Sequence, residues 1–124
     1  MKVINTEKAP KAIGPYVQAI EANKLIFVSG QVPINPKVGK IESNDIKDQT
    51  IQCMENIKAI LKQAESKLEK VIKCTIYVTD LKNFAIVNEV YGSYFIKHKP
   101  ARVCVEVSKL PLGAMIEIDA IATK

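Results

Sequence analysis

The sequence predicts an α/β (α+β) fold, a mixed β-sheet with two helices packed on one face. Two segments repeat apolar residues at intervals of three and four, which is typical of helices buried on one side. Five others are rich in β-branched residues or alternate apolar and polar residues, as strands do. The order β-β-(β)-α-β-α-β-β indicates a mixed sheet. With 124 residues and no linker or repeat, residues 1–124 form a single domain.

The first strands are expected in "YVQAIEA" (16–22) and "KLIFVSG" (24–30), which form a hairpin joined near Ala22-Asn23. The segment "VPINPKVGK" (32–40) contains two prolines and a glycine, so we expect a surface loop there.

The first helix is predicted from Asn44 to about Lys67, with Asn44 or Asp45 as its N-cap. The second is predicted from about Asn83 to Ile96, and Pro100 prevents it from continuing. Its apolar face consists of Phe84, Val87, Tyr91 and Phe95.

The remaining strands are expected at residues 71–79, 101–107 and 115–122. Two helices can cover only one face of a sheet of five or six strands. The apolar side chains left over favour a closed homo-oligomer that buries the second face. They include Ile76, Val78, Val103 and Val105.

Composition excludes several classes of function. The formal charge is +5, but the lysines are spread along the chain and the aromatic residues do not interleave with them, which does not favour nucleic-acid binding. Cys53, Cys74 and Cys104 form no CxxC pair, so neither a disulfide framework nor a metal site is indicated. Free thiols, and the lack of a signal or membrane-spanning segment, predict a cytoplasmic protein with no membrane contact.

Arg102 is the only arginine among 18 basic residues, and it lies in the strand-like run "KPARVCVEV". A planar guanidinium holds a carboxylate at two points, as lysine cannot. Side-chain alternation places Arg102, Cys104 and Glu106 on one face of their strand, and Glu117 and Asp119 on one face of theirs. Arg102 and a carboxylate of the last strand are therefore expected to approach each other. Such a pair either forms a site for an anion and a water, or is an ion pair that fixes strand register.

Other candidates are less specific. Asn88 lies on the apolar face of its helix, so it either bonds a strand end or reaches into a pocket. Ser29-Gly30 ends a strand and can offer backbone N–H groups to a ligand. Cys104 has no histidine placed to activate it, which indicates a core or lining residue. The chain has one histidine, so no metal set or catalytic triad is indicated.

These residues stand in motifs that resemble the Rid family, specifically the RidA subfamily, also known as YjgF proteins and as L-PSP endoribonucleases. The resemblance covers essentially the whole chain. The motifs that carry it are "AIGPYVQAI" (12–20), "FVSGQVP" (27–33), "NFAIVNEVYGSYF" (83–95), "PARVCVEV" (100–107) and "LPLGAMIEIDAIA" (110–122).

The resemblance implies a chorismate-mutase-like fold and a homotrimer whose sheets form a central barrel, with clefts between subunits. It also implies cofactor-independent hydrolysis of 2-imino acids and their enamine tautomers to 2-keto acids and ammonia. Arg102 would bind the substrate carboxylate, Glu117 would activate water, and Tyr16 would supply a hydroxyl. Ser29, Gly30 and Asn88 would line the cleft, where Cys104 would contribute mainly backbone groups.

Two alternatives stay open. The older family name suggests an endoribonuclease or translation inhibitor, supported here only by the basic charge. A trimer that binds small carboxylic acids without turnover would use the same residues. Lys99 stands where the family often has an aromatic residue. The positive charge of Lys99 could attract acidic substrates or narrow the preference for apolar side chains.

Overall fold

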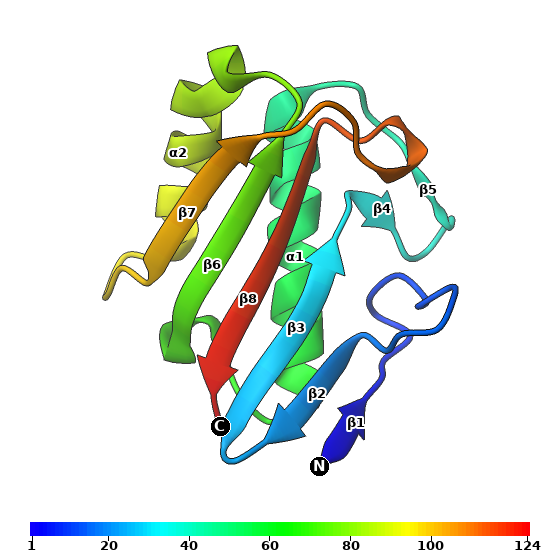
Figure 1. Ribbon diagram of the computed structural model, residues 1–124, viewed down its shortest axis with the longest axis vertical. Helices are drawn as coiled ribbons and strands as arrows, with labels where there is room; N and C mark the ends of the chain where they lie inside the picture. Colours follow the sequence, from blue (N-terminus) through cyan, green and yellow to red (C-terminus); the bar gives the residue numbers. More distant parts are fainter.

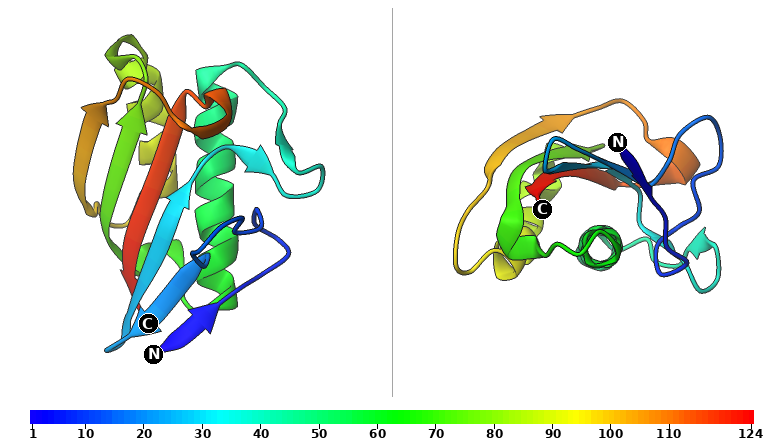
Figure 2. Two further views of the ribbon diagram at one scale, coloured as in Figure 1. Left: turned by 45° about the vertical axis from the view of Figure 1, so that its right-hand side comes forward. Right: turned by 90° about the horizontal axis from the view of Figure 1, so that it is seen from below.

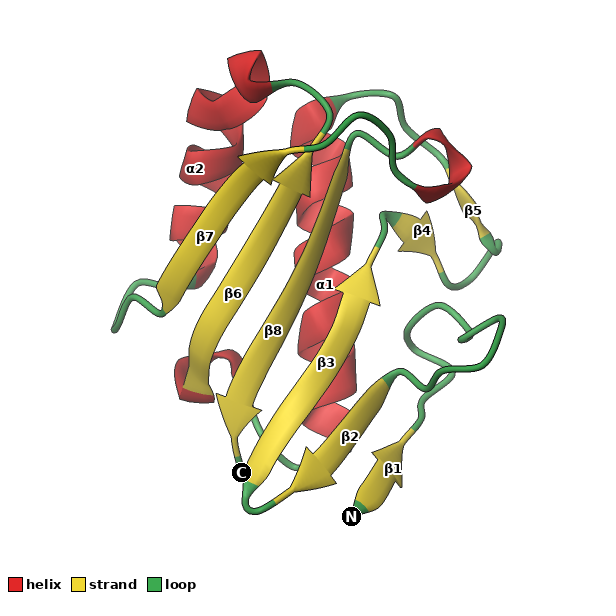
Figure 3. Ribbon diagram, viewed as in Figure 1, coloured by secondary structure: helices red, strands yellow, loops and turns green.

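The computed structural model describes residues 1–124 as one six-stranded sheet with two helices (Figures 1 and 3). The strand order is β1-β2-β3-β8-β6-β7; β6 and β7 are parallel, and every other pair is antiparallel. The helices are α1 (Ile46–Gln63) and α2 (Phe84–Tyr94), with short 3-10 turns at Leu68–Lys70, Leu81–Asn83 and Pro111–Gly113. The sheet strands are β1 (Lys2–Ile4), β2 (Ala19–Ala22), β3 (Leu25–Gln31), β6 (Val71–Val78), β7 (Ala101–Glu106) and β8 (Ile116–Thr123), and a separate pair is β4 (Ile34–Asn35) and β5 (Lys40–Ile41).

Both helices lie on one face of the sheet, which confirms the predicted fold class (Figure 2). The core between them is made of branched aliphatic side chains that leave little room for change without cavities or strain. Fully buried members include Ile26, Met54, Ile57, Ile60, Leu61, Ile76, Ile116 and Ile118.

The opposite, open face keeps apolar side chains without a cover. Val103 is 43% exposed, Val105 39% and Phe27 43%. The sequence-based expectation that Ile76 and Val78 belong to this surplus is wrong, since both are fully buried on the helix face. Alternation explains the difference, because Ile76 and Val78 pair with Cys104 and Glu106, and not with the valines of β7.

Several element boundaries differ from the prediction. Asp45 caps α1 by accepting from the backbone N–H groups of Lys47 and Asp48, which selects it over Asn44. The sequence gives no sign of strand β1, and the short β4–β5 hairpin, residues 34–41, lies where a loop is expected over residues 32–40. Two- and three-residue strands depend on their partners and carry too few residues to show a periodicity.

Helix α1 ends at Gln63, earlier than predicted, because Glu65 adopts a left-handed conformation with φ of 59°. The N–H of Ser66 donates to the Leu61 carbonyl at 2.8 Å, and that of Glu65 to the Lys62 carbonyl at 3.0 Å. These two bonds form a Schellman motif, in which glycine is the usual residue at the left-handed position.

We expect Glu65→Gly to stabilise the protein by about 1 kcal/mol, because a left-handed residue with a Cβ costs about 1–2 kcal/mol, partly offset by the greater freedom of unfolded glycine. The measurement is the urea dependence of unfolding. Glu65→Ala keeps the Cβ and should give no comparable gain. An equal gain in both variants would attribute the effect to the Glu65 charge instead of the backbone.

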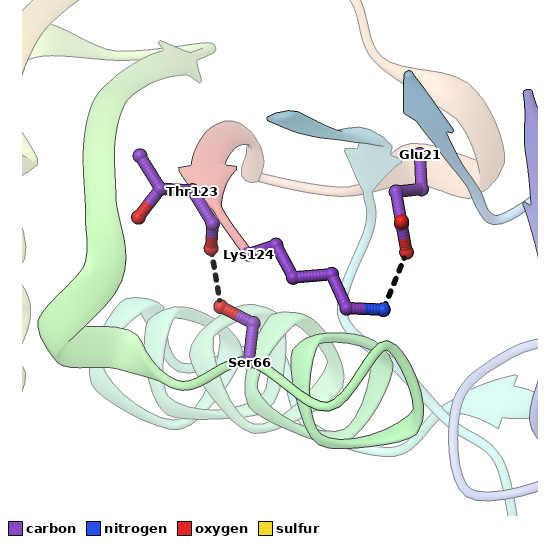
Figure 4. Close-up of polar contacts among 4 residues, drawn as sticks. All are labelled: Glu21, Ser66, Thr123 and Lys124. Atoms are coloured by element: carbon purple, nitrogen blue, oxygen red, sulfur yellow. Dashed lines mark hydrogen bonds and ion pairs between the residues drawn. The ribbon is translucent and has the colours of Figure 1, made fainter. Parts of the chain in front are cut away.

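The last two residues of the chain, Thr123 and Lys124, are tied to the rest of the domain (Figure 4). Lys124 forms the only ion pair in the chain, with Glu21 at 3.0 Å, and the Ser66 hydroxyl donates to the Thr123 carbonyl at 2.7 Å. Neither helix is long and apolar enough to cross a membrane.

Candidate functional site

Arg102 projects from β7 toward α2, where two side chains hold its guanidinium. Its Nη1 donates to Asn88 Oδ1 at 2.6 Å, and its Cζ lies 5.2 Å from the centre of the Tyr91 ring. The Phe84 ring is on the same side at 5.6 Å. The Asn88 amide and the Tyr91 ring fix the direction of the Arg102 guanidinium but leave its positive charge without an anionic partner.

The guanidinium opens into a cleft of about 330 Å³ between α2 and the start of β7. Asn88 contributes to this cleft, so of its two predicted roles the structure supports the pocket. We call this cleft, with Arg102 and Asn88, the arginine half-site. Its lining consists of Asn88, Tyr91, Gly92, Phe95, Lys99, Pro100 and Arg102.

No carboxylate of the chain pairs with Arg102. Glu106 shares its face of β7, but its carboxylate accepts from the Leu81 N–H at 2.9 Å. The predicted approach of Arg102 to a carboxylate of the last strand is wrong within one chain. Across the three strands, Arg102 of β7 pairs with Cys74 of β6, which pairs with Ala120 of β8, and both of these partners are buried on the helix face. Glu117 of β8 pairs with Tyr77 of β6, which pairs with Val105 of β7, and these residues lie on the open face. Strand β6 also separates β7 from β8.

Glu117 is half-buried on the open face, packed against Gly30 of β3. A Cβ added at Gly30 would come within 2.9 Å of Glu117 Cδ, so only glycine leaves the carboxyl group in place. The β3–β8 pairing is irregular between Val28 and Gln31, which places Gly30 at this contact. Burial first, and the nearby Asp119 charge second, raise the pKa of Glu117.

Asp119 is itself fixed on the open face. It accepts from the Thr75 N–H and from the Tyr77 hydroxyl, both at 3.2 Å. The sequence indicates that Asp119 shares a face with Glu117 but gives no sign of its partners, because Thr75 and Tyr77 lie 44 and 42 residues away in the sequence. The structure therefore adds a fixed negative charge next to the candidate base.

Ser29 adjoins Gly30 in β3, and Tyr16 lies in the loop before β2. The Ser29 hydroxyl donates to the Val17 carbonyl at 2.6 Å, which ties β3 to the residue after Tyr16. Buried Gln18 secures the same loop through bonds to Thr6, Ala9 and Pro10. The Tyr16 ring is 52% exposed. We call Tyr16, Ser29, Gly30 and Glu117 the glutamate half-site.

Cys104 lies on the Arg102 face of β7, half-buried against the core. Burial raises the pKa of its thiol, although Arg102 acts in the opposite direction. Its thiol is therefore not an activated nucleophile, and Cys104 packs against the core without lining the arginine half-site. No three His, Cys, Asp or Glu side chains are close enough to hold a metal ion.

The fold and the two half-sites define a small α+β domain with an unpaired arginine in a cleft and a partly buried carboxyl on an open sheet face. Residues 6–124 match the family model described as Endoribonuclease L-PSP. The chain is 58% identical to a RutC family protein of Pyrococcus horikoshii over 99% of this chain and 98% of that one. It is 46% identical to the 2-iminobutanoate/2-iminopropanoate deaminase of Escherichia coli K12, with the same coverage.

Among solved structures, E. coli TdcF with bound serine superposes with a TM-score of 0.95 at 43% identity, over 100% of this chain and 99% of that one. The chain belongs to the Rid family, which includes the YjgF, L-PSP and RutC family proteins.

Proposed function

We propose that the protein hydrolyses 2-imino acids such as 2-iminobutanoate and 2-iminopropanoate, and their enamine tautomers, to 2-keto acids and ammonia without a cofactor. The single observation that carries this proposal is Arg102, a guanidinium oriented by Asn88 and Tyr91 in a cleft and paired with no carboxylate. A site that holds an arginine in this state is prepared for the carboxylate of a ligand. The E. coli deaminase at 46% identity supports the choice of reaction.

Each half-site has a role in the reaction. Arg102 binds the substrate carboxylate through its free N–H groups and holds the imine carbon in reach. Glu117 accepts a proton from water as the water oxygen bonds to that carbon, the π electrons of the C=N bond move to the nitrogen, and the nitrogen takes this proton from Glu117. The proton of the new hydroxyl then passes through Glu117 to the nitrogen as the carbon–nitrogen bond breaks and the C=O bond forms, leaving keto acid and ammonia. A carboxyl whose pKa is raised is a better base for this step than an ordinary one.

The two half-sites have to meet between copies of the chain. Within one copy, Arg102 and Glu117 are on opposite faces of the sheet, so one substrate molecule cannot contact both. The uncovered Val103 and Val105 next to Arg102 give the open face an apolar surface for a second copy. We therefore place the active site between subunits of a homotrimer, with Arg102 from one subunit and Glu117 from its neighbour.

A competition assay tests the proposed activity. A pyridoxal-phosphate-dependent dehydratase acting on threonine would generate the enamine and imine in place, and semicarbazide would capture the free imine. Addition of the protein should lower the initial rate of semicarbazone formation and raise that of 2-oxobutanoate. An unchanged semicarbazone rate, with binding of 2-oxobutanoate retained, would instead support a carboxylate-binding trimer without turnover.

A ribonuclease is the second candidate, favoured by the description of the matched family model and by the basic charge of the chain. The single histidine, His98, bonds the Val71 carbonyl at 2.8 Å and packs edge-on against Phe95, so the chain offers no pair of histidines for acid–base cleavage of RNA. RNA cleavage that survives in Arg102→Lys would favour this candidate.

We expect Gly30→Ala to lower kcat by about tenfold to 100-fold with little change in Tm, because the new Cβ displaces the flexible end of Glu117 and not the backbone. The measurement is the deaminase rate with a thermal melt. If Gly30 acts through Glu117, the same substitution in a Glu117→Gln background should cause no further loss. Full additivity of the two losses would contradict this explanation.

A further inference from the structure

The arginine half-site carries two cations and no anion. Its lining contains the guanidinium of Arg102 and the ammonium of Lys99, and neither Asp nor Glu. The only ion pair in the chain is Lys124–Glu21, so Lys99 has no carboxylate partner. Two unpaired cations in one small cleft repel each other unless anionic groups lie between them.

Both cations line the same cleft. Lys99 lies in the loop before β7, ahead of Pro100, whose ring fixes the backbone there, so the alternation of side chains along the strand does not apply to it. Three residues of chain span at most about 10 Å, so the side chains of Lys99 and Arg102 start apart but within reach of one small molecule. The flexible stem of lysine lets its ammonium adjust to a second anionic group, whereas Arg102 is held by Asn88.

The surface between the two cations is mainly apolar. Tyr91 and Phe95 form part of the lining, are 6% and 2% exposed, and pack their rings together with the centres 4.8 Å apart. Gly92 adds no side chain to the cleft, and a Cβ at this position would contact nothing within 4 Å. A cation, an apolar wall and a second cation fit a short methylene chain with a carboxylate at each end.

We propose that this cleft selects dicarboxylic 2-imino acids and the matching dicarboxylic 2-keto acids, with Arg102 on the α-carboxylate and Lys99 on the side-chain carboxylate. The turnover part of this inference rests on the proposed function, whereas the binding part does not. The competing explanation is that Lys99 only complements the negative end of the α2 helix dipole.

The test compares two imines made in place by amino-acid oxidases: 2-iminoglutarate from glutamate and 2-iminobutanoate from 2-aminobutyrate. We expect wild-type kcat/KM to favour the dianion by about fivefold, the upper range of one partly exposed ion pair. Lys99→Met should remove this preference, Lys99→Glu should reverse it, and Lys99→Arg should keep it. Lys97→Met removes the same charge from an exposed residue outside the cleft lining and should leave the ratio unchanged.

Binding of 2-oxoglutarate and 2-oxobutanoate, measured by calorimetry on the same variants, separates this inference from the proposed function. Loss of tight 2-oxoglutarate binding in Lys99→Met but not in Lys97→Met would support the inference, even if no imine is hydrolysed. Hydrolysis of 2-iminobutanoate with the same substrate ratio in wild type and Lys99→Met would overturn it. An equal effect of both methionine variants would also overturn it, because the cause would be overall charge.

Discussion

Arg102→Lys is expected to lower kcat/KM for 2-iminobutanoate by about 100-fold, or ~2.7 kcal/mol, the value of one or two charge-assisted hydrogen bonds. Lysine keeps the positive charge but cannot donate two parallel bonds in one plane. It also cannot occupy the position between Asn88 Oδ1 and the Tyr91 ring in the same way. The measurement is the semicarbazide competition assay with wild type alongside.

Charge alone is insufficient if Arg102 acts through its geometry. Asn88→Ala should give a smaller loss than Arg102→Lys, because it frees the guanidinium without removing it. Full activity in Arg102→Lys would show that the cleft needs only a positive charge, and would remove the main support for the proposed site.

Glu117→Gln is expected to lower kcat by about 10²–10³-fold, the usual contribution of a general base, while the protein becomes more stable at neutral pH. The folded-state pKa of Glu117 is raised above its ordinary value by burial and by Asp119. Above this raised pKa the carboxyl is ionised in both states, and the ionised form is the one that the folded state disfavours. Glutamine removes this penalty, so the Tm should rise at pH 7.

The pH dependence has a definite sign. The stabilising contribution of Glu117 is present below its ordinary pKa and is lost as the pH rises through the raised value. The Tm advantage of Glu117→Gln should therefore shrink as the pH falls below about 4, the ordinary pKa of glutamate, where wild-type Glu117 becomes protonated in both states. An advantage that is the same at both pH values would show that ionisation of Glu117 is not its cause.

The deaminase rate should also depend on the ionisation of Glu117, but low pH should reduce the rate whereas it increases the contribution of Glu117 to stability. The rate of the wild type should fall as the pH drops through the raised pKa of Glu117, because a protonated carboxyl cannot accept the proton of water. Asp119→Asn removes the neighbouring charge but can still accept from Thr75, so this acid limb should move to lower pH.

The long elements of the fold could be predicted because their patterns are local. The intervals in α1 and α2 and the alternation in β6, β7 and β8 were sufficient to place the helices and to assign faces to Arg102 and Glu117. The end of α1 was missed, since glutamate gives no sign of a left-handed residue at position 65. Strand β1 was missed because three residues show no period.

The sequence indicates candidate residues for the site but not their arrangement. Alternation shows which residues lie on the same face of one strand. It does not show whether residues of two different strands lie on the same face of the sheet. That relation depends on the register of β6 with both β7 and β8, a long-range property of the sheet. Register therefore decides that Arg102 and Glu117 cannot meet in one chain.

The most direct test of a site shared between subunits is complementation of two inactive variants. Arg102→Lys and Glu117→Gln chains would be co-refolded in equal amounts, and the deaminase rate compared with that of each variant refolded alone. In a cyclic homo-oligomer about a quarter of the interfaces then combine an intact Arg102 with an intact Glu117, so about a quarter of wild-type activity should return. A mixture of Arg102→Lys with Arg102→Ala should stay inactive. No recovery in the first mixture, with mixed oligomers demonstrated, would contradict an active site built from two copies of the chain.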